Sequence, residues 1–267
     1  MKKGSETRII ACITLDLEPD HAGYSPEAYE CWQEEKLLDL LKLLKKYNIC
    51  LSIFVVTKSL KNHQRQINLF KSYKSEFYLH SHSHNLKYPD TMGEIKRGKK
   101  EFKKYFGKYP KGYRAPGGLI SEKGLNYLNK EGFLFDSSVI PSFWPKFSFF
   151  LKPSRPYKDT ASGIFEIPFS VVSPFRLVIA LSWIKLFGLS LYKILFHLFG
   201  FPNPLIFAFH LHDLWEVEAK NNLPLAWKLV YLRNPNGLEL LEQFLSFLKE
   251  SGYTFSTIGN LIEKDSH

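Results

Sequence analysis

Short apolar stretches alternate with longer amphipathic stretches along most of this chain, and this alternation restricts its possible folds more than any other feature. The apolar stretches are rich in β-branched and aromatic residues and span 9–15, 50–56, 77–79, 133–135, 165–169, 206–211 and 254–257. Helical spacing of apolar residues occurs between them, at 34–44, 92–106, 122–130, 238–249 and 258–263. Strands that alternate with helices build a mainly parallel sheet, and near-continuous apolar strands fit a sheet buried on both faces. We therefore expect an α/β fold whose sheet closes into a barrel.

The chain is expected to form one domain. Its 267 residues suit a single α/β barrel, and no repeat, low-complexity tract or flexible linker divides them. Hydrophobic residues make up 45% of the chain and charged residues 23%, which excludes a disordered or fibrous protein. We place the domain at 1–267, with a core of about 8–262.

The charge of the chain favours an anionic partner. Lys and Arg number 36 and Asp and Glu 26, so the net charge is +10. A polyanion, a nucleic acid or the negative face of a membrane would each match this charge. The basic run 96–104 has the spacing of a solvated helix face, and no compact Lys/Arg motif accompanies it. We therefore expect no nucleic-acid partner.

The cysteines and the first residues bear on the compartment. Cys12, Cys31 and Cys50 are an odd number without metal-ligand spacing, which is typical of a reducing compartment. The apolar stretch 9–15 is too short for a secretory signal and runs directly into acidic residues. We expect a cytoplasmic protein, with association with the inner face of the membrane as an option.

That option comes from the segment 176–209, which is dense in Leu, Ile and Phe. Lys, His, Gly and Pro residues interrupt it, which argues against a membrane-spanning helix. Drawn as one continuous helix, it has Lys185 and Lys193 on one side and Phe187 and Leu191 broadly opposite. Two interpretations remain open: a helix packed on the barrel, or a helix lying in a membrane interface. The second would suit a lipid-linked sugar as substrate.

Chemically reactive side chains occur where the predicted strands end. They are Asp16, the histidines at 80, 82 and 84, Arg114, Asp136, and the histidines at 210 and 212. The carboxyl ends of the strands of a barrel meet on one face, where such folds carry their active sites. We therefore expect these side chains to lie close together.

Two of these groups resemble parts of a metal site. His80 and His84, four residues apart, can reach one metal ion from a helix or a tight turn, or they can belong to a solvated turn. The segment 16–20 supplies three acids, enough for a base and a ligand, although Pro19 also favours a plain turn. A carboxylate with two histidines leaves positions for water on the ion, as a catalytic zinc requires. Arg114 stands in a Gly-rich turn that is either structural or close to a substrate.

Taken together, these segments resemble the NodB-homology polysaccharide deacetylases of carbohydrate esterase family 4, along nearly the whole chain. Five motifs of the family occur in order, at Ile13-Thr14-Leu15-Asp16-Leu17-Glu18, Leu79-His80-Ser81-His82-Ser83-His84, Arg114-Ala115-Pro116-Gly117-Gly118, Phe135-Asp136-Ser137-Ser138 and Leu211-His212-Asp213. Three departures are visible, and one of them is that the Trp often found shortly after the fourth motif's Asp is missing after Asp136. Glu18, one residue further on, replaces the second of two adjacent Asp residues, as in a D-x-E branch, and His210 replaces a Leu.

The resemblance implies a distorted (β/α)7-type barrel and a role for each residue. Glu18, His80 and His84 would bind a divalent metal, with Zn²⁺ expected and Asp20 as a rival ligand. The implied catalytic roles are Asp16 as the base, Arg114 as its partner, His212 as the acid, Asp136 as the residue that orients His212, and the Gly117 N–H as an oxyanion donor. The implied reaction is hydrolysis of the carbon–nitrogen bond of N-acetylated sugars in a glycan or a lipid-linked saccharide.

Two other functions remain open. One is a metal-free amidohydrolase on the same barrel, similar to the allantoinases, acting on a small substrate. The other is a catalytically inactive barrel that binds anionic glycans or membranes. Retention of Asp16, Arg114 and His212 beside the metal set weighs against an inactive barrel, because such a protein needs neither a base nor an acid. The sequence does not specify the sugar, or whether its acetyl group is on nitrogen or oxygen.

Overall fold

The computed structural model describes residues 9–20, 29–143, 151–216, 223–233 and 235–265. Within these residues, nine strands form one sheet and two more form a separate antiparallel pair. The strands of the sheet are β1 (Ile10–Leu17), β2 (Leu51–Val55), β3 (Ser75–Leu79), β4 (Gly112–Tyr113), β5 (Phe135–Asp136), β6 (Tyr157–Lys158), β7 (Phe165–Glu166), β10 (Leu205–His210) and β11 (Thr254–Ser256). The pair is β8 (Val171–Val172) and β9 (Leu177–Val178).

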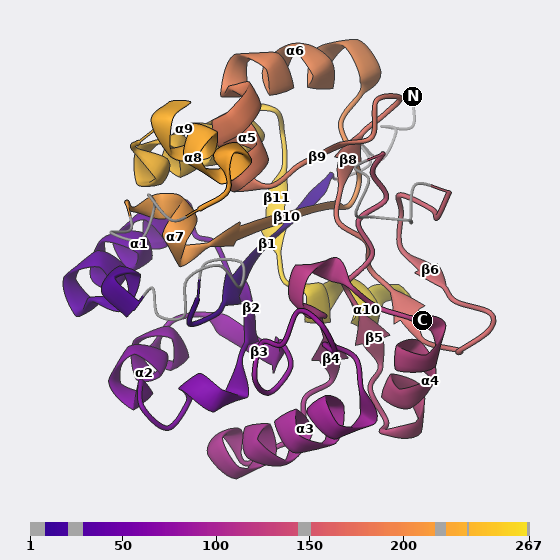
Figure 1. The fold of residues 1–267 in the computed structure, drawn as a ribbon. Coiled ribbons are helices and arrows are strands. Elements are labelled where there is room, and N and C mark those ends of the chain that lie inside the picture. The colour runs from indigo at the N-terminus through magenta and orange to yellow at the C-terminus, as the bar shows by residue number, and fades with distance from the viewer. Residues whose placement is uncertain (1–8, 21–28, 144–150, 217–222, 234, 266–267) are drawn as a thin grey trace, which may run out of the picture.

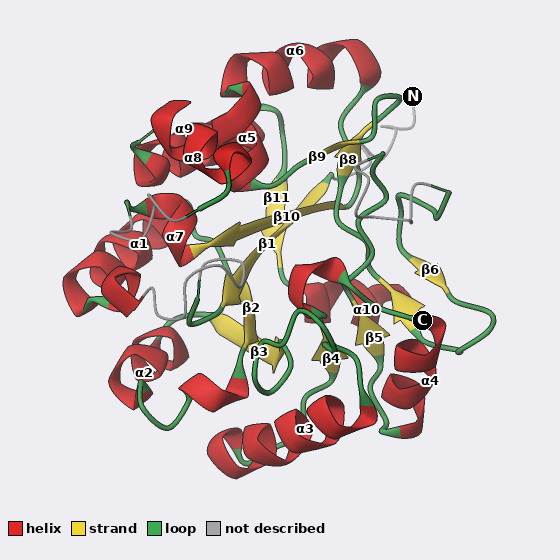
Figure 2. Cartoon of the chain, in the orientation of Figure 1, coloured by secondary structure: helices red, strands yellow, loops and turns green. Residues whose placement is uncertain are grey.

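The sheet curls into a distorted half-barrel (Figure 2). Its strand order is β10-β1-β2-β3-β4-β5-β7-β6, with β11 beside the first half of β1, and the pairing is parallel except between β6 and β7. The chain after β7 returns toward the other edge, where the Ser170 N–H donates to the Ile206 carbonyl at 3.1 Å. The α/β barrel class is confirmed, with an incomplete ladder between its two edges.

The helices flank the curled sheet, most of them on its outside (Figure 1), whereas Ile258 and Leu261 of the last helix pack with the inward-facing Cys12 and Phe54. They are α1 (Glu34–Lys46), α2 (Gln64–Ser72), α3 (Met92–Phe106), α4 (Glu122–Lys130), α5 (Leu181–Phe187), α6 (Leu189–Phe199), α7 (Leu211–Leu214), α8 (Leu225–Arg233), α9 (Gly237–Glu250) and α10 (Ile258–Asp265). Short 3-10 turns occupy Tyr29–Trp32, Thr57–Ser59 and Pro116–Gly118.

In strand β1 the core-packing side chains and the polar side chains lie on opposite faces of the sheet. Ile13, Leu15 and Leu17 belong to the cluster that packs against the outer helices. Alternate residues point to the opposite face, so Thr14 and Asp16 face the interior. A chain with near-continuous apolar strands therefore places isolated polar side chains inside its barrel.

The bounds of α3 and α4 agree with the helices expected at 92–106 and 122–130, because local signals mark their ends. The Thr91 hydroxyl caps the start of α3 by accepting the Glu94 N–H, and Gly107 ends that helix in the left-handed conformation. Helix α2 was not expected.

The segment 176–209 differs from the continuous helix drawn from the sequence. Gly188, with φ +89°, separates α5 from α6, and the two helices are bent by 102°. The grouping of Lys185 with Lys193 on one polar side is therefore wrong. Lys185 is buried and its Nζ donates to the Asp213 carbonyl at 2.9 Å, whereas Lys193 is exposed. A projection along one axis cannot describe a chain that changes direction.

Candidate active site and metal centre

Neighbouring strands bring the predicted residues together at the carboxyl end of the sheet. Asp16, near the end of β1, is paired in register with Phe54 of β2 and His210 of β10. His80 directly follows β3, and Arg114 directly follows β4. The side chains of Asp16, His80 and Arg114 are all buried. The expectation that strand ends would gather these residues is met.

Arg114 is fixed on all sides. Its Nη1 donates to Asp16 Oδ1 at 2.6 Å and to Thr14 Oγ1 at 2.8 Å. Its Nε donates to the Ser137 carbonyl and its Nη2 to the Ser137 hydroxyl, both at 2.9 Å. The guanidinium also lies 4.0 Å from the ring centroid of Phe54. The rigidly held Arg114 guanidinium binds Oδ1 of Asp16, so that the other carboxylate oxygen, Oδ2, is directed into the site.

Glu18, His80 and His84 form the candidate metal site. One ligand atom from each lies within 4.8 Å of the others, and all three side chains are buried. Glu18 Oε2 is 2.7 Å from His84 Nε2 and 3.5 Å from His80 Nε2. His80 Nδ1 lies 2.8 Å from the Arg114 carbonyl, which fixes a proton on that nitrogen and leaves Nε2 as the electron-pair donor. The middle histidine, His82, turns away to Thr57.

The loop from His80 to His84 adopts an unusual backbone. Ser81 and His84 have φ of 62° and 58°, a region that residues other than glycine rarely occupy. Glu94, in the first turn of α3, accepts the N–H groups of His82 at 3.2 Å and Ser83 at 2.9 Å. The Ser81 hydroxyl accepts the His84 N–H. These bonds hold the strained loop in the conformation that points His84 at Glu18.

The protonation of this cluster follows from its mutual contacts. Burial raises the pKa of Glu18, but the imidazoles of His84 and His210 outweigh burial and hold it well below its usual range. Burial lowers the pKa of His84, but the carboxylates of Glu18 and Asp20 outweigh burial and raise it to about 10. In the metal-free protein, positive charge therefore accumulates on His84 to balance the surrounding carboxylates.

The chemistry of these residues fits a divalent cation. One carboxylate oxygen and two imidazole nitrogens are the donor set that zinc binds. Both ring nitrogens of His84 are buried, and within the described residues neither makes a well-aligned hydrogen bond, although Glu18 and Asp20 oxygens lie 2.7 and 2.8 Å away. Donor atoms that are close but not aligned on each other suit a shared ion better than a hydrogen bond. Asp20 faces Nδ1 of His84, the nitrogen opposite Glu18.

His210 and His212 lie on the other side of Glu18. Glu18 Oε1 is 3.8 Å from His212 Nδ1 and 3.9 Å from His210 Nε2, and the two rings stack at 4.7 Å. Asp213 accepts from both the backbone N–H and Nδ1 of His210, at 2.8 and 3.0 Å. The Asp213 carboxylate therefore directs His210 Nε2 toward Glu18 and toward Asp16 Oδ2, 3.7 Å away. Together with Glu18, the two histidines form a second group that could hold a metal.

Asp136 has different partners from those expected. Among the described residues its carboxylate accepts from the Ser138 N–H and hydroxyl, at 3.1 and 2.7 Å, and it lies beside Glu166 in the adjacent strand β7. The Ser138 hydroxyl in turn accepts the Ala115 N–H at 2.7 Å. Asp136 thus supports the Arg114 loop rather than the ring of His212, because its side chain turns back to the residue two positions later.

Gly117 lies in the same loop, three residues after Arg114. Its φ of 63° is in the left-handed region that favours glycine, and an added Cβ would meet the Leu86 side chain at 3.3 Å. The glycine therefore allows the tight 3-10 turn after β4.

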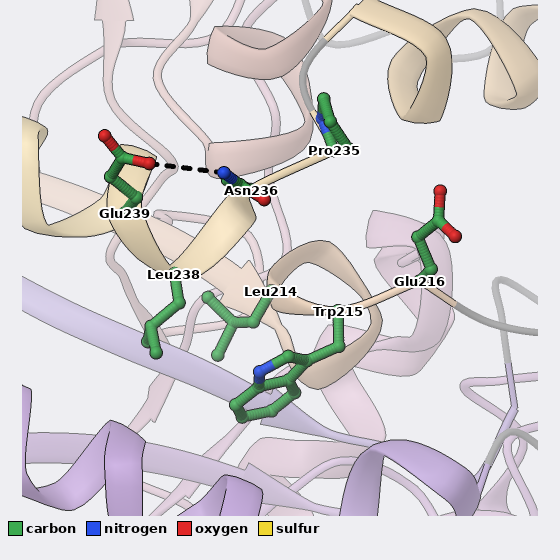
Figure 3. A pocket seen from close by; sticks show the side chains of 7 residues that line it. All are labelled: Leu214, Trp215, Glu216, Pro235, Asn236, Leu238 and Glu239. Carbon is green, nitrogen blue, oxygen red and sulfur yellow. Dashed lines mark hydrogen bonds between the residues drawn. The ribbon is translucent and has the colours of Figure 1, made fainter.

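A surface hollow of about 490 Å³ opens beside α7 (Figure 3). Its lining consists of Leu214, Trp215, Glu216, Pro235, Asn236, Leu238 and Glu239. It follows the His212–Asp213 motif in the chain but contains none of the predicted site residues, so we assign it no catalytic role.

Sequence reasoning did not single out several residues that build the site. They are Thr14, Glu94, Ser137, Glu166 and Asp213 as a partner of His210. Only Glu94 carries a local signal, because Thr91 followed three residues later by Glu is a typical helix-start pattern. The others act through partners that are distant in sequence or visible only in three dimensions.

Residues 11–135 match the model of a family described as Polysaccharide deacetylase. This stretch, slightly less than half of the chain, is similar to the polysaccharide deacetylase family. It runs from β1 to the start of β5 and contains Asp16, Glu18, His80, His84 and Arg114. The resemblance noted in the sequence is supported over residues 11–135, and the D-x-E branch stays a prediction. No functionally curated protein matches the chain.

Solved structures share the fold of this chain at low sequence identity. The Puue allantoinase matches with a TM-score of 0.63 and 14% identity, over 96% of this chain and 90% of its own. The Bc1960 peptidoglycan N-acetylglucosamine deacetylase matches with a TM-score of 0.57 and 15% identity, over 95% and 88%. BA3943 from Bacillus anthracis, described as a CE4 family pseudoenzyme, matches with a TM-score of 0.55 and 13% identity, over 96% and 66%. Because these neighbours differ in activity, the shared fold does not select a function.

Proposed function

We propose that this protein is a divalent-metal-dependent hydrolase that removes acetyl groups from N-acetylated sugars of a glycan or a lipid-linked saccharide. The observation that carries the proposal is the convergence of Glu18, His80 and His84 next to the Asp16–Arg114 ion pair. A metal-binding set beside a rigidly held carboxylate is the arrangement needed to activate a water molecule. The match of residues 11–135 to the polysaccharide deacetylase family supports the same substrate class.

Each residue has a role in the proposed reaction. Glu18, His80 and His84 hold the cation, expected to be Zn²⁺. A divalent cation in such a set polarises a carbonyl group and lowers the pKa of a water molecule. Asp16 accepts the proton of the attacking water, and Arg114 orients Asp16 by donating to its Oδ1.

The remaining steps concern charge and the leaving group. The Gly117 N–H donates a hydrogen bond to the oxyanion that forms from the carbonyl oxygen. His212 donates a proton to the departing amine nitrogen, so that acetate and a free amino sugar result. Asp136 acts indirectly by holding Ser138, which fixes the Arg114 loop.

The decisive experiment measures acetate release from a panel of N- and O-acetylated saccharides with purified protein. We expect release from N-acetylated sugars that a chelator abolishes and added Zn²⁺ restores, and no release by the Asp16→Asn variant. Chelator-insensitive hydrolysis of a small amide or ureide would instead support the allantoinase-like alternative. No turnover of any substrate by fully metal-loaded protein would support the inactive barrel.

A further inference from the structure

Helix α6 is apolar on both sides, although one side alone faces the core. Tyr192 and Phe196 are fully buried beneath it. On the opposite side Leu191, Ile194 and Leu198 are 38%, 56% and 68% exposed. A surface helix of a soluble protein normally turns polar residues to water, so a stripe of exposed branched side chains indicates a binding surface.

The stripe continues onto a neighbouring loop. Phe199 at the end of α6 meets Phe175 edge-on, with ring centroids 5.4 Å apart, and Phe175 is itself 58% exposed. Phe175 lies in the turn between β8 and β9, near one end of α6 (Figure 1). We name this surface the α6 patch and define it by Phe175, Leu191, Ile194, Leu198 and Phe199.

The chain segment that carries the α6 patch has formal charges of one sign. From Ile167 to His212 the chain contains no Asp or Glu, although 26 acidic residues occur elsewhere in it. Arg176 directly follows Phe175, and the exposed Lys193 directly precedes Ile194. Exposed apolar side chains flanked by cations complement the interface of an anionic bilayer, where hydrocarbon lies beneath a layer of negative headgroups.

The geometry favours a helix that lies on a bilayer over one that crosses it. Within the described residues no single helix is long and apolar enough to span a membrane. Helices α5 and α6 pass that test only together, by length and composition, and they are bent by 102°. Lys185 in α5 is buried and bonded to the Asp213 carbonyl, so straightening the pair would break the packing of α5.

We propose that the α6 patch binds the surface of an anionic lipid bilayer, which for a cytoplasmic protein is the inner face of the cell membrane. α5 connects this surface to the candidate site, because the Lys185 ammonium contacts the residue after His212. Resting on the function proposed above, this docking would present lipid-linked acetylated saccharides to the enzyme.

Vesicle co-sedimentation tests the proposal with the full chain. We expect binding to vesicles of 70% phosphatidylcholine and 30% phosphatidylglycerol, weaker binding at high salt, and little binding to pure phosphatidylcholine. The double variant Ile194→Ser/Leu198→Ser should lower the partition coefficient at least about tenfold, since two inserted side chains are lost. The matched control Leu225→Ser/Leu232→Ser removes two leucines of α8, 72% and 77% exposed, and should bind like the unmodified protein.

Three results would overturn the proposal: no binding to anionic vesicles, equal losses in the two double variants, or a dimer in light scattering that the α6 variant alone dissociates. The last would make the patch an interface between two copies of the chain. Circular dichroism confirms that each variant is folded. Acetate release from a soluble substrate is measured in parallel, so failure of membrane binding and failure of the proposed chemistry are separate outcomes.

Discussion

Asp16 and Glu18 are two residues apart yet have different surroundings. Asp16 is bonded through one oxygen to Arg114, whereas Glu18 has an oxygen facing each pair of histidines. A carboxylate neutralised by a fixed guanidinium suits proton transfer, and one surrounded by imidazoles suits ligation.

Replacing Asp16 by Asn tests this division of roles. We expect the Asp16→Asn variant to retain its metal and to lower kcat by about 10²- to 10⁴-fold, the usual contribution of a positioned base. Metal content by mass spectrometry and acetate release by a coupled assay measure the two effects. Loss of the metal in this variant would mean that Asp16 is a ligand.

The choice between Glu18 and Asp20 as ligand is tested by comparing two alanine variants. Glu18→Ala should remove the metal, because its oxygen lies nearest to both histidines. Asp20→Ala should weaken metal affinity only by about 10- to 100-fold, as expected of a group that orients His84 through its other nitrogen. The reverse order of affinities in calorimetric titrations would identify Asp20 as the ligand.

The buried pair Asp136 and Glu166 predicts a pH-dependent stability. Burial raises the pKa of Asp136 to about 6 and, with the nearby Asp136 carboxylate, that of Glu166 well above its usual range. Raised pKa values of acids in the folded state mean that the folded protein binds protons more tightly than the unfolded chain. The free energy of unfolding therefore falls as pH rises from the unfolded pKa values near 4 through 6.

The Glu166→Gln variant should show a smaller decrease in the free energy of unfolding as pH rises. Its amide oxygen can still accept the Val139 N–H, and its NH₂ can donate to Asp136. Between pH 5 and pH 8, the free energy of unfolding of the variant should decrease by at least about 1 kcal/mol less than that of the unmodified protein, since one pKa unit is worth about 1.4 kcal/mol. Urea unfolding at both pH values measures the difference, and Glu122→Gln, at an exposed position in the first turn of α4, serves as the control. Parallel pH curves for all three proteins would refute the prediction.

At the scale of elements, the histidine loop after β3 depends on the start of α3. Glu94 accepts two backbone N–H groups of this loop and the Ser83 hydroxyl. We expect Glu94→Ala to weaken metal binding by about 10- to 100-fold although Glu94 touches neither metal-binding histidine. Lys100→Ala, an exposed change on the same helix, should leave the affinity unchanged. Equal metal affinities of the two variants in a competition assay with a chelating dye would show that the histidine loop keeps its conformation without Glu94.

The elements also differ in how well their local sequence specifies them. Helices α3 and α4 carry their own caps and were expected with the right bounds. The helical projection did not predict the bend between α5 and α6, because a projection assumes a single helix axis. The burial of Lys185 was also not predicted, because it depends on a contact with Asp213, which is distant in sequence. Amphipathic spacing alone therefore placed Lys193 on the same polar side as Lys185, which the structure does not show.

At the scale of the whole molecule, metal binding should stabilise the fold. The ligands come from β1 and from the loop after β3, so an ion joins segments far apart in sequence. Zn²⁺ at 100 times its dissociation constant should raise the free energy of unfolding by about 2.7 kcal/mol. Thermal unfolding with and without chelator measures this effect, and the double variant His80→Ala/His84→Ala should show no dependence on the ion. If Zn²⁺ stabilised the double variant as much as the unmodified protein, the ion would have to bind at another site.

The sequence by itself determined the alternation of strands and helices, the barrel class, the family resemblance and most members of the site. These follow from periodicity and short motifs, which are properties of neighbouring residues. Only the tertiary structure decided that His210 is held by Asp213 beside Glu18, that Asp136 supports Ser138, and that an apolar face of α6 stays exposed. Partners and exposure depend on the way distant segments pack, and no local pattern encodes that packing.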